Sequence, residues 1–224
     1  MSQILLPSDP AYAGQAQYTP RFLAHVYDPL VVRFANRIGW RCPSSVILRH
    51  YDEHVGAVHL DAGPGTGWFL DRCRFPTETP QITLLDVNED VLNSSSKTLR
   101  RYQPRRHQAN VLEPISGLEP ESHDSAALAH VLHCLPGALT EKACVLDHVK
   151  ALVRSGGTVF GSTVLAEGVA HNRFSRSYND YLNEIGVFSN RGDSRGALDE
   201  ALALRFERYD LAVVGTVALF AAVV

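Results

Sequence analysis

The stretch HLDAGPGTGWFL, residues 59–70, combines an apolar run that ends in an acid, three alternating glycines and a second apolar run. This pattern predicts a buried strand, a tight turn and the start of a helix, because glycine adopts the positive φ angles that such a turn requires. Gly63, Gly65 and Gly67 also let a ligand approach the backbone closely, and the amides at the following helix start attract negative charge. The turn is therefore predicted to hold an anion or a carboxylate.

Strands and helices alternate after this turn. Predicted strands cover residues 57–63, 81–87, 106–110, 124–130 and 156–165, with a helix capped by Asn88 and another capped by Thr140 between them. The final strands, 208–215 and 216–224, are joined by a tight turn that forces antiparallel pairing. The order predicts an α/β fold with a doubly wound, seven-stranded, mostly parallel sheet and an antiparallel last strand.

Residues 1–54 are predicted to form a helical cap before a core of residues 55–224. Thr19 and Pro20 indicate a helix start, Pro29 is expected to separate two short helices, and a further helix is expected from Ser44. Residues 166–193 are polar and aromatic with little periodicity, which predicts an insertion across the rim of the sheet. Such segments often carry substrate contacts. A helix is predicted to resume over residues 194–206.

The composition is that of an ordinary globular domain of 224 residues, with 45% hydrophobic and 20% charged content. A formal net charge of -3 gives no general attraction to polyanions, so neither nucleic acid nor a membrane surface is an expected partner. The four cysteines lack paired spacing, which is typical of a reducing compartment and favours the cytoplasm. The apolar run over residues 211–224 is interrupted and too short to span a bilayer, which favours two buried strands.

The acid at the end of the second strand narrows the choice of ligand. Asp86 follows Asp61 by 25 residues, the place from which a carboxylate accepts hydrogen bonds from a ribose diol. An adenosine-bearing cofactor is therefore predicted. A dinucleotide fingerprint would need glycine at position 68, where this chain has Trp68, so a nicotinamide oxidoreductase is disfavoured.

Several motifs in order carry a resemblance to a known family. DAGPGTG after an apolar strand and LLDVN closing the second strand resemble the first two motifs of the class I S-adenosylmethionine-dependent methyltransferases. Three later segments, QANVLEP, SAALAHVLHCLPG and ALVRSGGTVFGSTV, resemble the family's adenine-contacting stretch, fourth strand and fifth-strand region. The resemblance covers residues 55–224 and implies a Rossmann-like fold and S-adenosyl-L-methionine as cofactor. The cap resembles the substrate-covering helices of members that act on small molecules.

The resemblance also implies a set of cofactor contacts. The glycines would line the amino-acid end of the cofactor while an acid orders the turn, and the acid of the second strand would hold the ribose. A tyrosine from the cap could bind the methionine carboxylate. The amide of Asn110, which stands where the family often has aspartate, can still accept from the adenine amine. The predicted cofactor residues are Tyr18, Asp61, Gly63, Gly65, Gly67, Asp86, Val87, Asn110, Val111 and His130.

Methyl transfer from a sulfonium neutralises charge, so an enzyme gains most by holding the nucleophile, methyl and sulfur in line and dry. A base assists if the acceptor is a hydroxyl or a protonated amine. His130, at the carboxyl end of the fourth strand, is the first candidate for this base, although packing against the cofactor is an alternative role. His133 is the second candidate, and bracing of its loop is the alternative. The H-x-x-H-C pattern at 130–134 lacks a second ligand cluster, so no metal is predicted.

Side chains of the cap and the insertion are candidates for acceptor binding: His25, Tyr27, Trp40, Arg173, Tyr178, Tyr181 and Asn190. The leading hypothesis is a metal-independent methyltransferase that acts on a small-molecule metabolite by in-line substitution. The alternative is a protein that binds the cofactor without transferring its methyl group, as a regulator or a partner subunit.

Overall fold

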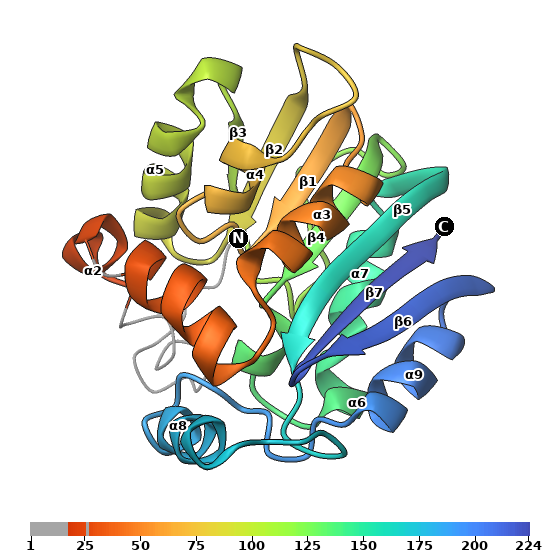
Figure 1. Cartoon of the computed structure of the whole chain (residues 1–224). Helices are drawn as coiled ribbons and strands as arrows, with labels where there is room; N and C mark the ends of the chain where they lie inside the picture. Colours follow the sequence, from red (N-terminus) through yellow and green to blue (C-terminus); the bar gives the residue numbers. More distant parts are fainter. Residues whose placement is uncertain (1–17, 26) are drawn as a thin grey trace.

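The computed structural model describes residues 18–25 and 27–224 (Figure 1). One seven-stranded sheet with the order β3-β2-β1-β4-β5-β7-β6 forms its centre. The strands are β1 (Val58–Ala62), β2 (Gln81–Asp86), β3 (Arg105–Gln108), β4 (His123–Ala129), β5 (Val153–Val164), β6 (Arg208–Val214) and β7 (Val217–Val223). Only β7 runs against its neighbours β5 and β6, while the other pairs are parallel, so the predicted sheet is confirmed.

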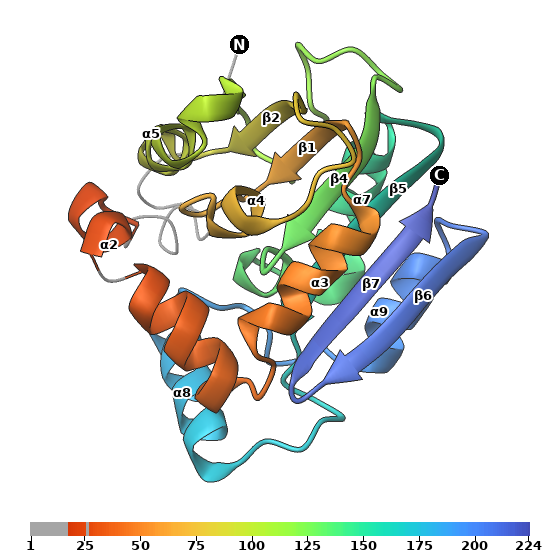
Figure 2. The ribbon, with the colours of Figure 1, turned by 45° about the horizontal axis from the view of Figure 1, so that its top comes forward.

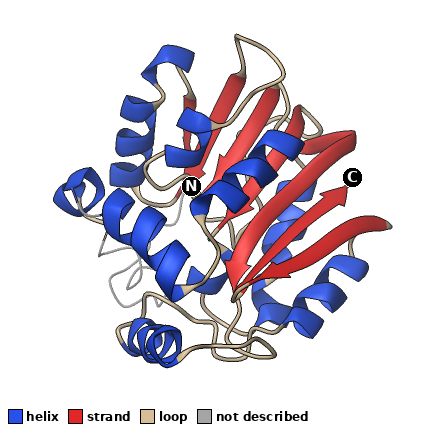
Figure 3. Cartoon of the chain, in the orientation of Figure 1, coloured by secondary structure: helices blue, strands red, loops and turns tan. Residues whose placement is uncertain are grey.

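Helices cover both faces of the sheet, as Figures 2 and 3 show. The helices before and within the first half of the sheet are α2 (Pro20–His25), the π-helix η1 (Tyr27–Gly39), α3 (Ser44–His54), α4 (Trp68–Arg72), α5 (Glu89–Thr98) and the 3₁₀ turn η2 (Arg100–Tyr102). Those of the second half are η3 (Leu132–Cys134), α6 (Leu139–Lys142), α7 (Cys144–Lys150), α8 (Arg173–Glu184) and α9 (Arg195–Ala203). Across residues 18–25 and 27–224, no helix combines the length and apolarity needed to cross a membrane.

The two faces bury separate apolar clusters because successive side chains of a strand point to opposite sides. Leu85 joins the cluster under α6, α7 and α9. Its neighbour Leu84 joins the cluster under α3, α4 and α5, together with Ile47 of α3. Helices on both faces leave no solvated side to the central strands, which explains their nearly continuous apolar sequences.

The strand register brings three chain segments to one edge of the sheet. Asp61 of β1 pairs with Leu84 of β2 on one side and with Ala127 of β4 on the other. Because these strands are parallel, their carboxyl ends and the loops that follow lie together. The glycine turn, the acid of β2 and the loop after β4 therefore share one rim.

The boundary between the first two helices of the cap differs from the prediction. Thr19 caps α2 as expected, with its Oγ1 accepting from the Phe22 amide at 3.4 Å. The expected break at Pro29 is wrong, because α2 ends at His25 and Pro29 lies in the first turn of η1. Proline is accepted there because a first-turn amide has no partner within its helix.

Three further predictions about the helices are wrong. Thr140 is not an N-cap: α6 starts at Leu139, and the Glu141 carboxylate accepts from the Ala138 amide at 3.0 Å. The expected single helix is divided into α6 and α7. Residues 166–193 are not irregular throughout, since they contain the amphipathic helix α8. Its N-cap, Asn172, accepts a hydrogen bond from the Ser175 amide at 2.7 Å. The helix predicted over 194–206 is confirmed as α9, with Ser194 as its N-cap.

The turn between β6 and β7 is hydrogen-bonded to the segment that follows η1 and packs closely on it. Gly215 has a φ of 62°, and the amide of the next residue, Thr216, donates to the carbonyl of Trp40 at 2.9 Å. A Cβ on Gly215 would stand only 2.2 Å from the Trp40 oxygen. Glycine is required here by both its φ and the close approach of two backbones.

Replacing Gly215 with alanine is expected to lower the free energy of unfolding by about 3 kcal/mol, because it adds backbone strain and a clash with a carbonyl. Urea denaturation of both proteins measures this difference. Gly192→Ala is the matched control, since a Cβ there meets nothing within 4 Å. Equal stability of the Gly215 and Gly192 variants would contradict the expected packing of the turn.

Candidate functional site

The glycine turn after β1 has the conformation that the sequence predicts. Gly63 and Gly65 have φ values of 73° and 56°. A Cβ on Gly63 would lie 2.6 Å from a methyl carbon of Val131, and one on Gly65 would lie 2.9 Å from the hydroxyl of Tyr27. Both the positive φ values and the close packing of Val131 and Tyr27 require glycine here, so the turn presents bare backbone at the rim of the sheet.

A cavity opens between this turn, the end of β2 and the loop after β4. We call it the first cavity, and its volume is about 460 Å³ including its mouth. Its lining residues are Tyr18, Tyr27, Gly63, Gly65, Asp86, Val91, Ala129, His130, Val131, Cys134 and Leu135. Six of the residues predicted from the sequence therefore meet in one space: Tyr18, Tyr27, Gly63, Gly65, Asp86 and His130.

Asp86 supplies the acid of this cavity. Its side chain is buried, and its Oδ1 accepts from the Asn88 amide at 2.8 Å, which fixes the carboxyl group at the end of β2. Burial raises the pKa of Asp86 to about 7, against the lowering effect of the backbone amides. A carboxylate that burial destabilises in this way gains most from a ligand that donates hydrogen bonds to it.

Asp61 lies beside the turn and outside the lining of the first cavity. It is buried, and its Oδ2 accepts from the Tyr51 hydroxyl at 2.9 Å and lies 3.7 Å from Nε2 of His59. Its Oδ1 has no hydrogen-bond partner among the described residues. A buried carboxylate oxygen without a partner near the first cavity indicates a place for a donor that the protein itself does not supply.

His130 stands where β4 gives way to its loop. It has a φ of 58°, an unusual value for a residue with a side chain, and its amide donates to the Ser162 carbonyl at 2.8 Å. Nε2 of its ring is buried and lacks a hydrogen-bond partner in the described part of the chain. Burial lowers the pKa of His130 to about 4, so the ring is neutral at pH 7.

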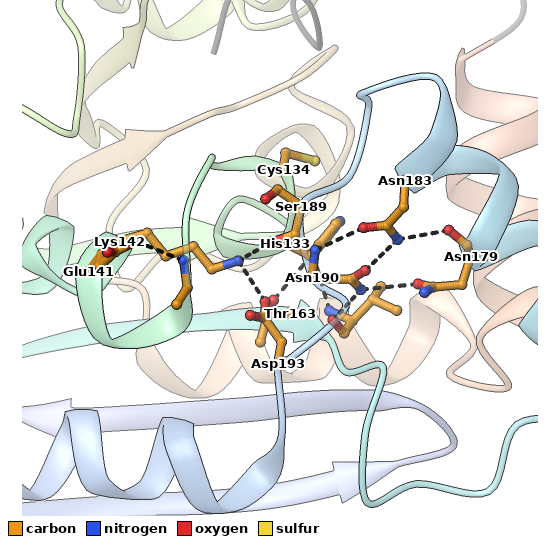
Figure 4. Close-up of polar contacts among 12 residues, drawn as sticks. His133, Cys134, Glu141, Lys142, Thr163, Asn179, Asn183, Ser189, Asn190 and Asp193 are labelled. Atoms are coloured by element: carbon orange, nitrogen blue, oxygen red, sulfur yellow. Dashed lines mark hydrogen bonds and ion pairs between the residues drawn. The ribbon is translucent and has the colours of Figure 1, made fainter. Parts of the chain in front are cut away.

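His133 is held by the protein and does not line the first cavity. Figure 4 shows it within a group of polar contacts that also includes Thr163, Ser189 and Asn190. Its Nδ1 accepts from the Val164 amide at 3.1 Å, so the proton of the neutral ring is on Nε2. Its ring packs on Phe188 with a centroid separation of 4.3 Å. The geometry supports the alternative that the sequence left open, a histidine that braces the loop after β4.

A second cavity adjoins the first and shares Tyr27, Gly63, Ala129 and His130 with it. Its other lining residues are Val32, Asn36, Tyr51, Pro64, Thr66, Trp68 and Phe69. Thr66 of the glycine turn donates to Asp28 of η1 at 2.6 Å, which ties the cap to the turn. The cap therefore forms a wall of both cavities.

The residues expected near the adenine lie outside both cavity linings. The backbone oxygen of Val87 accepts from Gln108 at 3.0 Å. Asn110 accepts from the Leu112 amide at 3.1 Å, and the oxygen of Val111 lies 2.8 Å from Nδ1 of His148. Gly67, which is expected at the amino-acid end of the cofactor, also lies outside both linings. It has a φ of 77° and serves as the N-cap of α4. Contacts from these four residues to a cofactor remain predictions.

Two of the aromatic residues expected to bind the acceptor, Trp40 and Tyr178, stack on each other between the cap and α8. Trp40 is buried, and its ring stacks on Tyr178 with a centroid separation of 5.5 Å. Tyr181 and Arg173 lie at the surface of α8. None of these four lines either cavity. The side chain of His25 lies outside the described part of the structure.

Asn190 belongs to a buried polar network. Its Nδ2 donates to the Val164 carbonyl at 2.9 Å and to Asn179 at 3.0 Å, while its Oδ1 accepts from Asn183 at 2.8 Å (Figure 4). The side-chain amide is thus engaged on both ends by the protein. The expected contact between Asn190 and a substrate is replaced by a scaffold that joins α8 to the end of β5.

The same network contains a buried ion pair. Lys142 of α6 lies 2.8 Å from Asp193 and donates to the Ser189 carbonyl at 2.6 Å (Figure 4). The Ser189 amide in turn donates to the His133 carbonyl at 2.8 Å. Separating Lys142 from Asp193 would leave a buried charge without its partner, which is costly. The pair and the adjoining hydrogen bonds therefore hold the segment after α8 against the loop that carries His130.

Sequence reasoning missed three residues that the structure brings to the site: Asp28, Asn36 and Tyr51. Tyr51 follows Ile47 by four positions, a helical spacing that indicates a buried face but no partner for its hydroxyl. The hydrogen bond between Asp28 and Thr66 joins residues 38 positions apart, so no local pattern could reveal it.

Comparisons with known proteins agree with this arrangement. Residues 60–159 match the model of a family described as a methyltransferase domain. The demethylluteothin O-methyltransferase of Streptomyces thioluteus is 41% identical over 209 residues, which cover 93% of this chain and 90% of the relative. The chain belongs to the class I S-adenosylmethionine-dependent methyltransferases.

A second relative and a solved structure agree with this family and with its fold. A physcion biosynthesis cluster O-methyltransferase of Aspergillus chevalieri is 34% identical over 95% of this chain and 96% of the relative. The solved DhpI–SAH complex shares the fold, with a TM-score of 0.64 over 94% of each chain at 17% identity. The chain is thus an enzyme of the methyltransferase type, and the predicted family is confirmed.

The pKa of Asp86 leads to a prediction about stability. In the folded protein this pKa is about 7, above the ordinary value of 3.8, so the folded state binds more protons between these two values. Stability in the absence of ligand should therefore fall as the pH rises from about 4 to about 7. Asp86→Asn, which keeps an oxygen for the Asn88 amide, is expected to be about 2–4 kcal/mol more stable than the parent at pH 8.

Urea denaturation at a series of pH values measures this effect. Glu113→Gln, which neutralises an exposed acid in the loop after β3, is the matched control. An Asp86→Asn protein with the pH profile of the parent would show that the carboxyl group of Asp86 ionises normally.

Proposed function

We propose that this enzyme methylates a hydroxyl group of a small-molecule metabolite with S-adenosyl-L-methionine as methyl donor. The observation that supports this most directly is the first cavity, where bare glycine backbone, a buried acid and a neutral histidine meet. Two relatives that match nearly the whole chain bear the name O-methyltransferase, one of them from a physcion biosynthesis cluster. A role in specialised metabolism follows from the same relatives.

The residues of the first cavity suit this cofactor. Gly63 and Gly65 present bare backbone to the cavity, and the unpartnered Oδ1 of Asp61 offers an acceptor next to the turn. Asp86 is placed to accept from a ribose diol. When bound, the cofactor supplies a methyl group on a positively charged sulfur, ready for in-line substitution. Val87, Asn110 and Val111 are proposed to face the adenine.

The protein's own part is to place the acceptor, exclude water and take up a proton. His130 would accept the hydroxyl proton at a ring nitrogen, since the imidazole is neutral at pH 7. Tyr18 and Tyr27 cover the cavity, and burial raises the pKa of both phenols, which keeps them uncharged. Uncharged phenols beside the reacting atoms suit a reaction in which charge is neutralised.

The alternative, binding of the cofactor without methyl transfer, is not favoured by the relatives, which are named methyltransferases. We further propose that residues up to 54 act as the cap over the site, given that η1 contributes to both cavity linings. Cytoplasmic location is proposed from the four free cysteines.

Calorimetric titration with S-adenosylhomocysteine tests the cofactor. We expect one binding site per chain, no binding of NAD, and a loss of at least about 10-fold in affinity for Asp86→Ala, since that change removes a charge-assisted hydrogen bond. Glu113→Gln serves again as the control. Binding of NAD in preference to S-adenosylhomocysteine would overturn the proposal.

Replacing His130 with asparagine tests the base. Asparagine tolerates a positive φ, so the variant removes the imidazole with little backbone strain. We expect kcat with a hydroxylated acceptor to fall about 100-fold or more, while affinity for S-adenosylhomocysteine changes less than about threefold. The rate is measured as formation of S-adenosylhomocysteine from S-adenosyl-L-methionine in the presence of each of a panel of small hydroxylated compounds. The methyl ethers of these compounds serve as blanks. A variant with the parent's kcat would limit His130 to a packing role.

A further inference from the structure

Three potential metal ligands meet on the last turn of α3, away from the first and second cavities. His50, Glu53 and His54 each offer one ligand atom, and these atoms all lie within 4.8 Å of one another. The spacing of three and four residues puts the side chains on one face of the helix. This is the one such group of three or more that the described residues contain.

The ring of His50 is oriented as in a metal site. Its Nε2 lies 2.9 Å from the carbonyl oxygen of Phe220 in β7, a contact in which the ring must donate. The lone pair of the neutral ring is then on Nδ1. Histidines that bind metals usually donate their other nitrogen to a carbonyl or a carboxylate in this way. The rings of His50 and His54 adjoin, with centroids 4.6 Å apart.

The surroundings favour a cation. His54 lies at the edge of a surface hollow that also contains the acids Glu207 and Asp210 and one opposing cation, Arg208.

The cluster lies at the edge of the sheet opposite the glycine turn. His54 precedes the first residue of β1, whereas the turn follows its last residue. Figure 1 shows α3 lying across the sheet beside β5 and β7, with its end next to the start of β1. A metal ion here would be far from any transferred methyl group and would connect α3 to the β6–β7 hairpin through His50.

We propose that His50, Glu53 and His54 form a binding site for one divalent transition-metal ion of the zinc type, which fastens the end of α3 to strand β7. Two imidazoles and one carboxylate are a donor set that suits Zn²⁺, Ni²⁺ or Cu²⁺ and suits Mg²⁺ or Ca²⁺ poorly. Water completes the coordination, as at other sites with three protein ligands. The site is independent of the proposed methyl transfer and serves structure.

Calorimetry and absorbance spectroscopy test this site on protein without an affinity tag, after treatment with EDTA and its removal. Titration with Zn²⁺ is expected to show one ion per chain and a higher Tm, because the ion binds the folded state. Co²⁺ is expected to give visible absorption bands of a tetrahedral site that Zn²⁺ abolishes. Mg²⁺ should produce neither effect.

Glu53→Gln is the decisive variant, since Glu53 is exposed and its replacement leaves the packing of α3 intact. It should weaken Zn²⁺ binding at least about 10-fold, and His54→Gln should do the same. His107→Gln, a half-buried histidine of β3, is the matched control. Unchanged affinity for S-adenosylhomocysteine in all three variants shows that each is folded. Absence of one-to-one binding, or equal binding by the parent and Glu53→Gln, would overturn the proposal.

Discussion

The parallel pairing of β1 with both β2 and β4 is the constraint on which the site depends. Asp61 is in register with Leu84 and Ala127, so the three strands end at one rim. Backbone hydrogen bonds fix this alignment and two apolar clusters bury it on both faces. The glycine turn, Asp86 and His130 are distant in sequence and meet only because the strands that carry them are aligned.

The cap and the segment after α8 complete the site by contacts of a different kind. Asp28 binds the hydroxyl of Thr66, and Tyr27 covers the glycine turn, so the cap is fastened by side chains. On the other side, the buried pair Lys142–Asp193 fastens the segment after α8. Polar anchors of this type cost desolvation energy but select one arrangement of the loops, because any other arrangement leaves a buried charge alone.

Much of the fold could be predicted because the signals are local. Asn88 is an N-cap in the structure as in the prediction, and the glycines of the turn have the positive φ values that their pattern indicated. The errors also have local causes. Helix α8 was missed because its polar residues outnumber its apolar ones, and Thr140 was mistaken for a cap because the Glu141 side chain, rather than a hydroxyl, binds the first free amide.

The sequence by itself determined the α/β class, the glycine turn, the acid of β2 and the family, since each depends on residues that are neighbours in the chain. Only the tertiary structure decided the roles of individual side chains. His130 and His133 are three residues apart and chemically identical, yet one lines the cavity while the other binds the Val164 amide. Asn190 became a scaffold residue in the same way. Such roles are set by hydrogen-bond partners and burial, which depend on residues far away in the chain.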